Sequence, residues 1–174
     1  MFSRLNNAAE SVGSVHAIFK DKTPEEIQNL LDVIKVDGKD ALGRMPVHYA
    51  CEVGDIRRLR ALVSKSADLN ASDNEKKRPI HYACQIDNYN IIKLLVEQKI
   101  ELNVQDSPGR TPLHYTCNTG NFKIAEFLVN QGPDVNVRDN EGKTPLHIAC
   151  QKGHRYIVEL LLSKKSDRDI VDAN

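Results

Sequence analysis

The sequence has no excess of charge of either sign, since 24 Lys and Arg residues balance 24 Asp and Glu residues among its 174 positions. Proteins that bind nucleic acids usually carry a basic excess. The chain also lacks a run of about 18 apolar residues, the length that a membrane-spanning helix requires. Its first 20 residues lack the unbroken apolar stretch of a secretory signal. These absences argue against a nucleic-acid binder and against membrane insertion, and we expect a cytoplasmic or nuclear protein.

Cysteine is scarce, and its spacing argues against a disulfide framework. The four cysteines, Cys51, Cys84, Cys117 and Cys150, are each 33 residues apart. Equivalent positions in stacked repeats lie about one repeat width apart, which exceeds the roughly 7 Å between Cα atoms that a disulfide allows. Free cysteine is among the most frequently buried residue types. We therefore expect all four cysteines to be small core residues.

One motif occurs four times. Thr144–Cys150 reads TPLHIAC, and steps of 33 residues toward the N-terminus give TPLHYTC at Thr111–Cys117, RPIHYAC at Arg78–Cys84 and MPVHYAC at Met45–Cys51. No insertion or deletion separates the copies. A fixed period of about 20–50 residues is the signature of a repeat protein, in which each unit buries its apolar face by stacking on its neighbours.

Each unit is predicted to contain two helices separated by a tight turn. A proline follows the opening turn at a fixed position, where it can start a helix because its missing N–H would have no partner there anyway. Thr111 and Thr144 precede this proline as capping residues in the last two units. The first helix should end at residues that tolerate a left-handed conformation. These residues are Gly54, Asp87, Gly120 and Gly153.

The predicted organisation is a tail, a capping helix and four repeats. The tail covers 1–22, the capping helix 23–39, and the repeats 40–72, 73–105, 106–138 and 139–171. Thr23 and Pro24 form a helix start, and an apolar stripe with a period near 3.6 residues follows. The second repeat has Lys76 in place of Gly and Arg78 in place of Thr, so we expect a weaker turn and cap. Arg168 replaces an apolar residue, so the array either stops there or was cut as a fifth repeat began.

The unit of turn, helix and helix with a T-P-L-H-x-A motif resembles the ankyrin repeat over roughly residues 40–171. This resemblance implies an all-α solenoid of helix-turn-helix units with short β-turn or hairpin fingers. It also implies a protein-binding module that is not an enzyme and needs no cofactor. We expect a monomer whose partner is another protein, with no small-molecule substrate.

A histidine precedes each repeated cysteine by three residues, which places both on one helix face. The histidines are His48, His81, His114 and His147. Catalysis needs one asymmetric site, and structural zinc needs four converging ligands, whereas one unit supplies two. We therefore predict neither a catalytic nor a metal site. The resemblance implies instead that the histidines bond the backbone between neighbouring turns.

Two further rows of residues each permit two interpretations. Tyr49, Tyr82 and Tyr115 share one position of the repeat, and Ile148 completes it. The row is either a half-buried ladder, which we favour, or an exposed aromatic strip. The second row precedes each proline by two residues. It is either a solvated face, which is favoured, or a basic strip for an acidic partner, and it consists of Arg44, Lys77, Arg110 and Lys143.

Partners of ankyrin repeats usually contact the turn tips and the concave side of the first helices, so the resemblance implies two sets of binding residues. The turn-tip set is Ala41, Leu42, Arg44, Asn74, Glu75, Lys77, Ser107, Pro108, Arg110, Asn140, Glu141 and Lys143. The first-helix set is Glu52, Val53, Gln85, Ile86, Asn118, Thr119, Gln151 and Lys152. Leu42, Val53 and Ile86 are the apolar members. If exposed, they are candidates for a binding hot spot.

Three functional classes fit this prediction. The first is an adaptor or scaffold that holds a partner on its surface. The second is a stoichiometric inhibitor of a signalling or transcription factor, similar to the ankyrin-repeat inhibitors of NF-κB-type factors, including viral or pathogen-borne versions. The third is the repeat part of a larger enzyme or channel.

Overall fold

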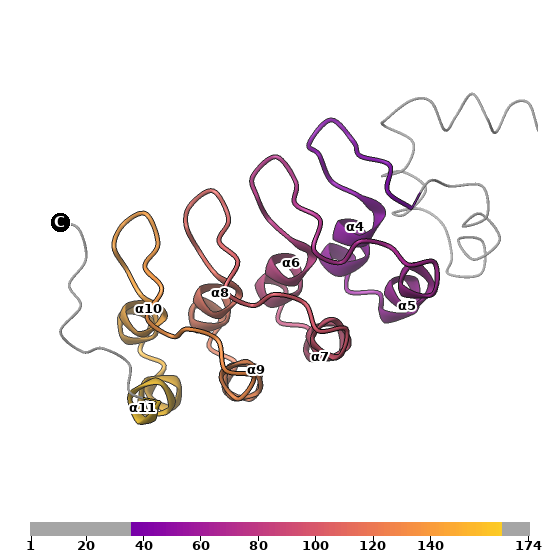
Figure 1. Ribbon diagram of the computed structural model, residues 1–174. Coiled ribbons are helices and arrows are strands. Elements are labelled where there is room, and N and C mark those ends of the chain that lie inside the picture. The colour runs from indigo at the N-terminus through magenta and orange to yellow at the C-terminus, as the bar shows by residue number, and fades with distance from the viewer. Residues whose placement is uncertain (1–35, 165–174) are drawn as a thin grey trace, which may run out of the picture. The chain divides into compact units, whose positions relative to one another are not determined.

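The computed structural model describes residues 36–164, which form eight α-helices (Figure 1). The predicted tail over 1–22, nearly all of the predicted capping helix over 23–39 and the end of the fourth predicted repeat lie outside this range. The described range contains no β-strand, which confirms the all-α fold class. In chain order the helices are α4 (Pro46–Val53), α5 (Ile56–Ser64), α6 (Pro79–Gln85), α7 (Tyr89–Glu97), α8 (Pro112–Thr119), α9 (Phe122–Val129), α10 (Pro145–Lys152) and α11 (Arg155–Ser163).

The first helix of each repeat starts at the predicted proline. The residue before the proline is in an extended conformation where its cap is recorded, with ψ of 166° at both Thr111 and Thr144. The hydroxyl of Thr144 accepts a hydrogen bond from the backbone N–H of His147 at 3.4 Å. Proline can occupy the first helical position because it has no N–H to leave unpaired. These contacts fix where each first helix begins.

Left-handed residues end the first helices, as predicted. Gly54 has φ of 82°, Gly120 of 86° and Gly153 of 74°, and Asp87 adopts φ of 61° at the same place in the second repeat. Glycine adopts this conformation without strain, whereas a residue with a Cβ atom pays about 1–2 kcal/mol. The turn then reverses the chain into the second helix, which Asp55 caps in the first repeat by accepting the N–H groups of Arg57 and Arg58.

The described chain forms two compact units. Unit 1 contains the residues up to Ala83 together with Asn90–Ile100, and unit 2 contains Cys84–Tyr89 together with the residues from Glu101 onward. In unit 1, α4 packs on α5. In unit 2, α8 packs on α9 and α10 on α11, while α10 also packs on α8 and α11 on α9. Each helix in unit 2 therefore buries one side against its own pair and another against the next repeat.

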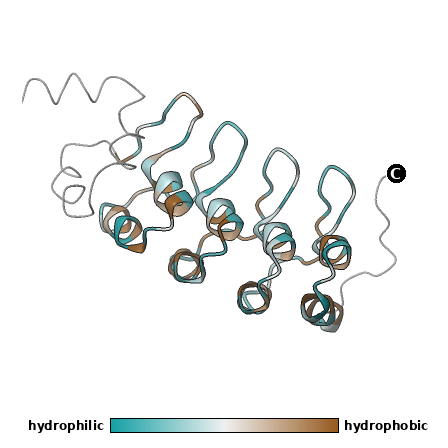
Figure 2. Ribbon diagram, turned by 180° about the vertical axis from the view of Figure 1, so that it is seen from behind, coloured by the Kyte–Doolittle hydropathy of each residue, from teal (hydrophilic) through white to brown (hydrophobic). Residues whose placement is uncertain are grey.

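The cores consist of aliphatic side chains from both helices of each repeat. Figure 2 shows the hydrophobic colour concentrated on the helices, while the long turns between repeats are mostly hydrophilic. In unit 1 the fully buried large side chains include Tyr49, Leu59, Leu62, Ile91 and Leu95. In unit 2 they include Ile124, Leu128 and Ile157. Apolar burial at about 25 cal/mol per Å² is the main force that holds such repeats together.

The prediction for the cysteines is right for three positions and wrong for one. Cys51, Cys84 and Cys117 are buried, but Cys150 is exposed. All four occupy the same place on a first helix, on the side that the next repeat covers in a stacked array. Cys150 belongs to α10, and within residues 36–164 no helix pair follows α10 and α11. Burial at this position therefore depends on the neighbouring repeat and not on the residue type.

Candidate binding surface

The repeated histidines hold the backbone together. In unit 1 the backbone N–H of Met45 donates to Nδ1 of His48 at 2.9 Å, so the ring proton is on Nε2, which donates to the carbonyl of Ala71 at 3.0 Å. In unit 2 the ring of His114 links Thr111 to the carbonyl of Lys143 in the same way, at 3.0 and 3.1 Å. Burial lowers the pKa of both histidines, which keeps them neutral. These contacts explain the repeated histidine as a structural residue.

The tyrosine row is tied to the aspartate that opens each repeat. Each phenol donates to the aspartate nine residues earlier: Tyr49 to Asp40, Tyr82 to Asp73 at 2.5 Å, and Tyr115 to Asp106 at 2.5 Å. Tyr49 and Tyr82 are 2% and 9% exposed, and Tyr115 is half-buried, so the row is a ladder within the repeats and not an exposed strip. Burial, together with the hydrogen bond to the aspartate, raises the pKa of Tyr49 and of Tyr82.

The aspartate also closes the turn that presents the tip. Oδ1 of Asp40 accepts the backbone N–H groups of Leu42 and Arg44 at 2.9 and 2.8 Å. Burial works to raise the pKa of Asp40, but these bonds and the one from Tyr49 outweigh it and lower the pKa. Asp73, Asp106 and Asp139 make the equivalent bonds in their own turns. The turn tips are therefore held by a carboxylate anchored on the first helix.

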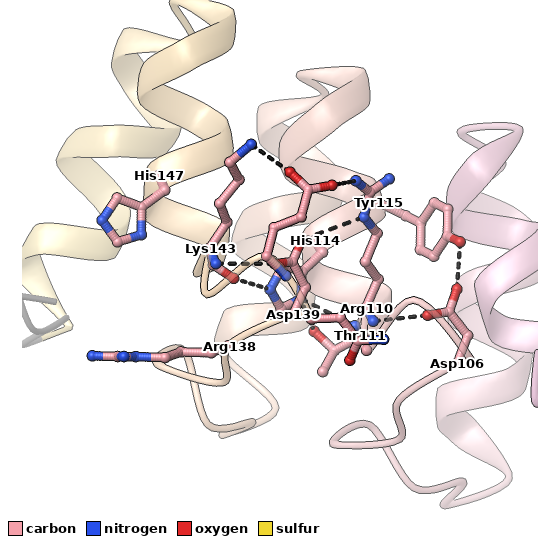
Figure 3. A network of polar contacts seen from close by, with 12 residues as sticks. Asp106, Arg110, Thr111, His114, Tyr115, Arg138, Asp139, Lys143 and His147 are labelled. Carbon is pink, nitrogen blue, oxygen red and sulfur yellow. Dashed lines mark hydrogen bonds and ion pairs between the residues drawn. The ribbon is translucent and has the colours of Figure 1, made fainter. Parts of the chain in front are cut away.

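The fourth repeat lacks this anchor because Ile148 replaces the tyrosine. Oδ2 of the buried Asp139 has no hydrogen bond among the described residues, and its nearest cation is Arg110, whose Nε lies 3.5 Å away (Figure 3). Arg110 comes from the preceding repeat of unit 2 and also lies 3.8 Å from Glu141. An ion pair between repeats thus takes the place of the phenol–carboxylate bond.

The basic row is largely neutralised within the chain. Arg44 pairs with Asp40 and Glu52 and lies 4.4 Å from the centre of the Tyr49 ring. Lys77 pairs with Glu75 at 3.1 Å, and Lys143 with Glu141 at 2.6 Å. The side chains of these three cations are only 15–20% exposed. This pairing favours a solvated and internally paired row over a free basic strip.

Adjacent turn tips are stacked by asparagine. Asn74 donates its amide to the carbonyl of Ala41 at 3.1 Å in unit 1, and Asn140 donates to the carbonyl of Ser107 at 2.8 Å in unit 2. A Cβ atom on Gly43 would lie 2.3 Å from Oδ1 of Asn74. Glycine at this position therefore allows the close approach as well as the positive φ of 73°. The tips are consequently positioned by the repeat beside them.

The structure exposes the predicted first-helix set. All eight residues, Glu52, Val53, Gln85, Ile86, Asn118, Thr119, Gln151 and Lys152, are exposed. The apolar members of the two predicted sets are exposed too, with Leu42 at 55%, Val53 at 54% and Ile86 at 40%. Leu42 and Val53 belong to unit 1 and Ile86 to unit 2. Exposed aliphatic residues at these positions are available for contact with a partner.

Asp87 brings part of this surface together in unit 2. Its carboxylate accepts a hydrogen bond from the amide of Asn121 at 2.9 Å and lies 3.3 Å from the hydroxyl of Thr119. Ile86 precedes Asp87 directly, so the predicted residues of the second and third repeats meet at this carboxylate. Sequence reasoning identified Asp87 only as a substitute for glycine. Its role in joining two inter-helix turns depends on a separation of 32 and 34 residues.

Sequence reasoning missed an aromatic group at the starts of the second helices in unit 2. Phe122 and Tyr156 are 40% and 70% exposed, and their rings meet edge to face at 6.3 Å. Tyr89 and Phe127 form a second such pair at 5.5 Å, with the ammonium of Lys123 4.2 Å from the Tyr89 ring. The sequence signal was the 33-residue spacing of Tyr89 and Phe122, which lies outside the first-helix motif.

The described residues offer no site for metal chemistry. Within residues 36–164, no three His, Cys, Asp or Glu side chains are grouped in a way that could hold a metal ion. None of the helices in this range has the length and hydropathy to cross a lipid bilayer. The features on which a function can be argued are therefore the exposed surfaces.

Comparison with protein families agrees with this architecture. The family model for ankyrin repeats (3 copies) matches residues 14–106 and again residues 99–172. A search of curated proteins found no match.

Proposed function

The chain belongs to the ankyrin-repeat family, whose members are generic protein-interaction modules, and from this premise we propose that it is an adaptor or scaffold that holds one partner protein. The partner contacts the turn-tip and first-helix sets. The observation that carries this proposal is the exposure of Leu42, Val53 and Ile86 on a framework that buries its other repeated aliphatic positions. Apolar side chains in such places supply most of the binding energy in protein interfaces.

The mechanism is presentation of a surface that is ordered before the partner arrives. The histidine bridges, the phenol–carboxylate bonds and the stacked asparagines fix the turns in the free protein. Binding to an ordered surface loses little conformational entropy, so weak individual contacts suffice. No step of this mechanism needs a cofactor or a reaction.

The test is affinity capture from an extract of the source cells with the whole chain as bait. A variant carrying Leu42→Ala, Val53→Ala and Ile86→Ala should retain its fold, because these side chains are largely exposed. We expect it to bind the captured partner about tenfold more weakly or worse, since hot-spot residues contribute about 2 kcal/mol or more each. Leu162→Ala removes an aliphatic side chain of 37% exposure from α11 and should leave binding unchanged. Equal binding by the triple variant and the wild type would refute the proposed surface.

A further inference from the structure

Unit 1 has a groove of about 370 Å³ on its second helices, between α5 and α7. Its lining residues are Ile56, Arg60, Asn90, Lys93, Leu94 and Glu97. None of them belongs to the turn-tip set or to the first-helix set. Asn90 and Glu97 are seven residues apart on one helix, so the groove runs for about 10 Å along α7. This length accommodates a short segment of another chain.

The groove contains the free positive charge that the basic row lacks. Arg60 is exposed and has no hydrogen-bond or ion-pair partner for its side chain among residues 36–164. Lys93 pairs with Glu97 at 3.9 Å, but both side chains are about half exposed, at 52% and 55%. Exposed pairs of this kind contribute about 0–1 kcal/mol and exchange readily. Two cations therefore face one weakly held carboxylate.

The groove also has an apolar part. Ile56 and Leu94 are half-buried and line it from opposite helices. An apolar contact flanked by positive charge is selective, because it favours a side chain that is hydrophobic and has acidic neighbours. A nucleic acid fits less well, because its phosphates would meet the carboxylate of Glu97 and leave the aliphatic side chains without contact.

We propose that this groove docks an acidic segment of a partner protein, whose carboxylates pair with Arg60 and Lys93 and whose aliphatic side chain packs on Ile56 and Leu94. The groove is a second binding surface, on the second helices, and it does not depend on the surface proposed above. A chain with two separate binding surfaces can bring two proteins together.

The test measures binding of a fluorescein-labelled peptide made of repeated Glu-Glu-Leu-Leu units to the full chain by fluorescence anisotropy. The peptide with Gln in place of Glu should bind about tenfold more weakly, since two surface ion pairs together supply about 1.4 kcal/mol. The double variant Arg60→Glu/Lys93→Glu should lose affinity by at least about the same factor. Added salt should weaken the binding of the Glu peptide.

Matched variants separate the groove from net charge. Arg57→Glu makes the same change on the same helix at a residue that does not line the groove, and it should change the affinity far less than either substitution in the groove. A peptide with Lys in place of Glu should bind the Arg60→Glu/Lys93→Glu variant better than the wild type. If circular dichroism shows that this variant is unfolded, Arg60→Gln/Lys93→Gln replaces it, with the same loss expected for the Glu peptide.

Several outcomes would overturn the proposal. They are no binding of the Glu peptide to the wild type, equal binding of the Glu and Gln peptides, or equal effects of Arg57→Glu and the double variant. Loss of peptide binding in Val53→Ala would assign the peptide to the first-helix set instead. Sedimentation that shows a dimer of the wild type and a monomer of Arg60→Glu/Lys93→Glu would assign the groove to a second copy of the chain.

Discussion

Single residues in this protein act through partners that lie one repeat position away. The tyrosine of each first helix secures the aspartate of its own turn, and the asparagine at a turn tip secures the tip of the repeat before it. One substitution therefore affects an interaction that recurs elsewhere in the same chain. The other repeats serve as internal references for what the interaction contributes.

The fourth repeat tests the phenol–carboxylate bond. Ile148→Tyr should place a hydroxyl beside Oδ2 of Asp139, the buried oxygen without a hydrogen bond. We expect the free energy of unfolding to rise by about 1 kcal/mol relative to Ile148→Phe, since that is the net contribution of a typical hydrogen bond. Urea denaturation of the two variants measures this difference. The Phe variant controls for the larger ring, and equal stability of the two would contradict the expected bond.

Lys76 tests the backbone of the second repeat. It adopts φ of 57°, where Gly43, Gly109 and Gly142 stand in the other repeats. Lys76→Gly should raise the free energy of unfolding by about 1 kcal/mol, because glycine removes the steric cost of a left-handed residue. Thermal unfolding should show a higher melting temperature. Glu75→Gly, in the same turn but not at a positive φ, should be neutral or destabilising, and stabilisation by both substitutions would exclude the conformational explanation.

At the scale of elements, buried histidine joins each first helix to the turn that follows it. His48 bonds the carbonyl of Ala71 in unit 1, and His114 bonds that of Lys143 in unit 2. Both rings are fully buried and neutral. Protonation would place a charge in the interior and would remove the acceptor at Nδ1 on which the helix start depends.

The stability of the protein should therefore fall in mild acid. Burial lowers the pKa of His48 and His114 below the value near 6.5 of the unfolded chain. Between these values the unfolded state binds more protons, so the free energy of unfolding rises with pH and falls as the pH drops below about 6.5. Urea denaturation at several pH values between 5 and 8 measures the slope.

His114→Gln provides the matched variant for this slope. It should be less stable at pH 7.5 by about 1–3 kcal/mol, because it leaves buried polar groups without partners. It should also lose stability less steeply in acid, since one of the two titrating rings is gone. A slope as steep as that of the wild type would show that other groups cause the acid sensitivity.

At the scale of the whole molecule, the cysteines report whether the repeats are stacked. Three are buried and Cys150 is exposed. Burial raises the pKa of the Cys84 thiol to about 12 and also raises that of Cys117. The thiolate is the reactive form, so these buried cysteines should not react near pH 8.

Titration of the folded protein with Ellman's reagent should therefore detect one fast thiol, and all four cysteines should react in guanidinium chloride. Cys150→Ser should remove the fast phase and leave three thiols that react only on unfolding. Two or more fast thiols in the folded wild type would mean that a first helix is not covered by its neighbour.

Much of the fold follows from the sequence because the repeat enforces it. Proline before the first helix and a left-handed residue after it act through local sterics, so their positions could be predicted residue by residue. The exposure of Val53 and Ile86 followed from the same register. The sequence by itself thus determined the fold class, the helix boundaries and the positions available for binding.

Only the tertiary structure decided which side chains remain free. Cys150 has the sequence context of a core residue and is exposed, while Arg44 and Lys77 have that of a basic strip and are paired. Conversely, Arg60 and Lys93 carried no sequence signal and line the groove between α5 and α7. Burial and charge pairing depend on distances between residues about 33 positions apart. Stacking of the repeats sets those distances, and a periodic sequence pattern does not encode them.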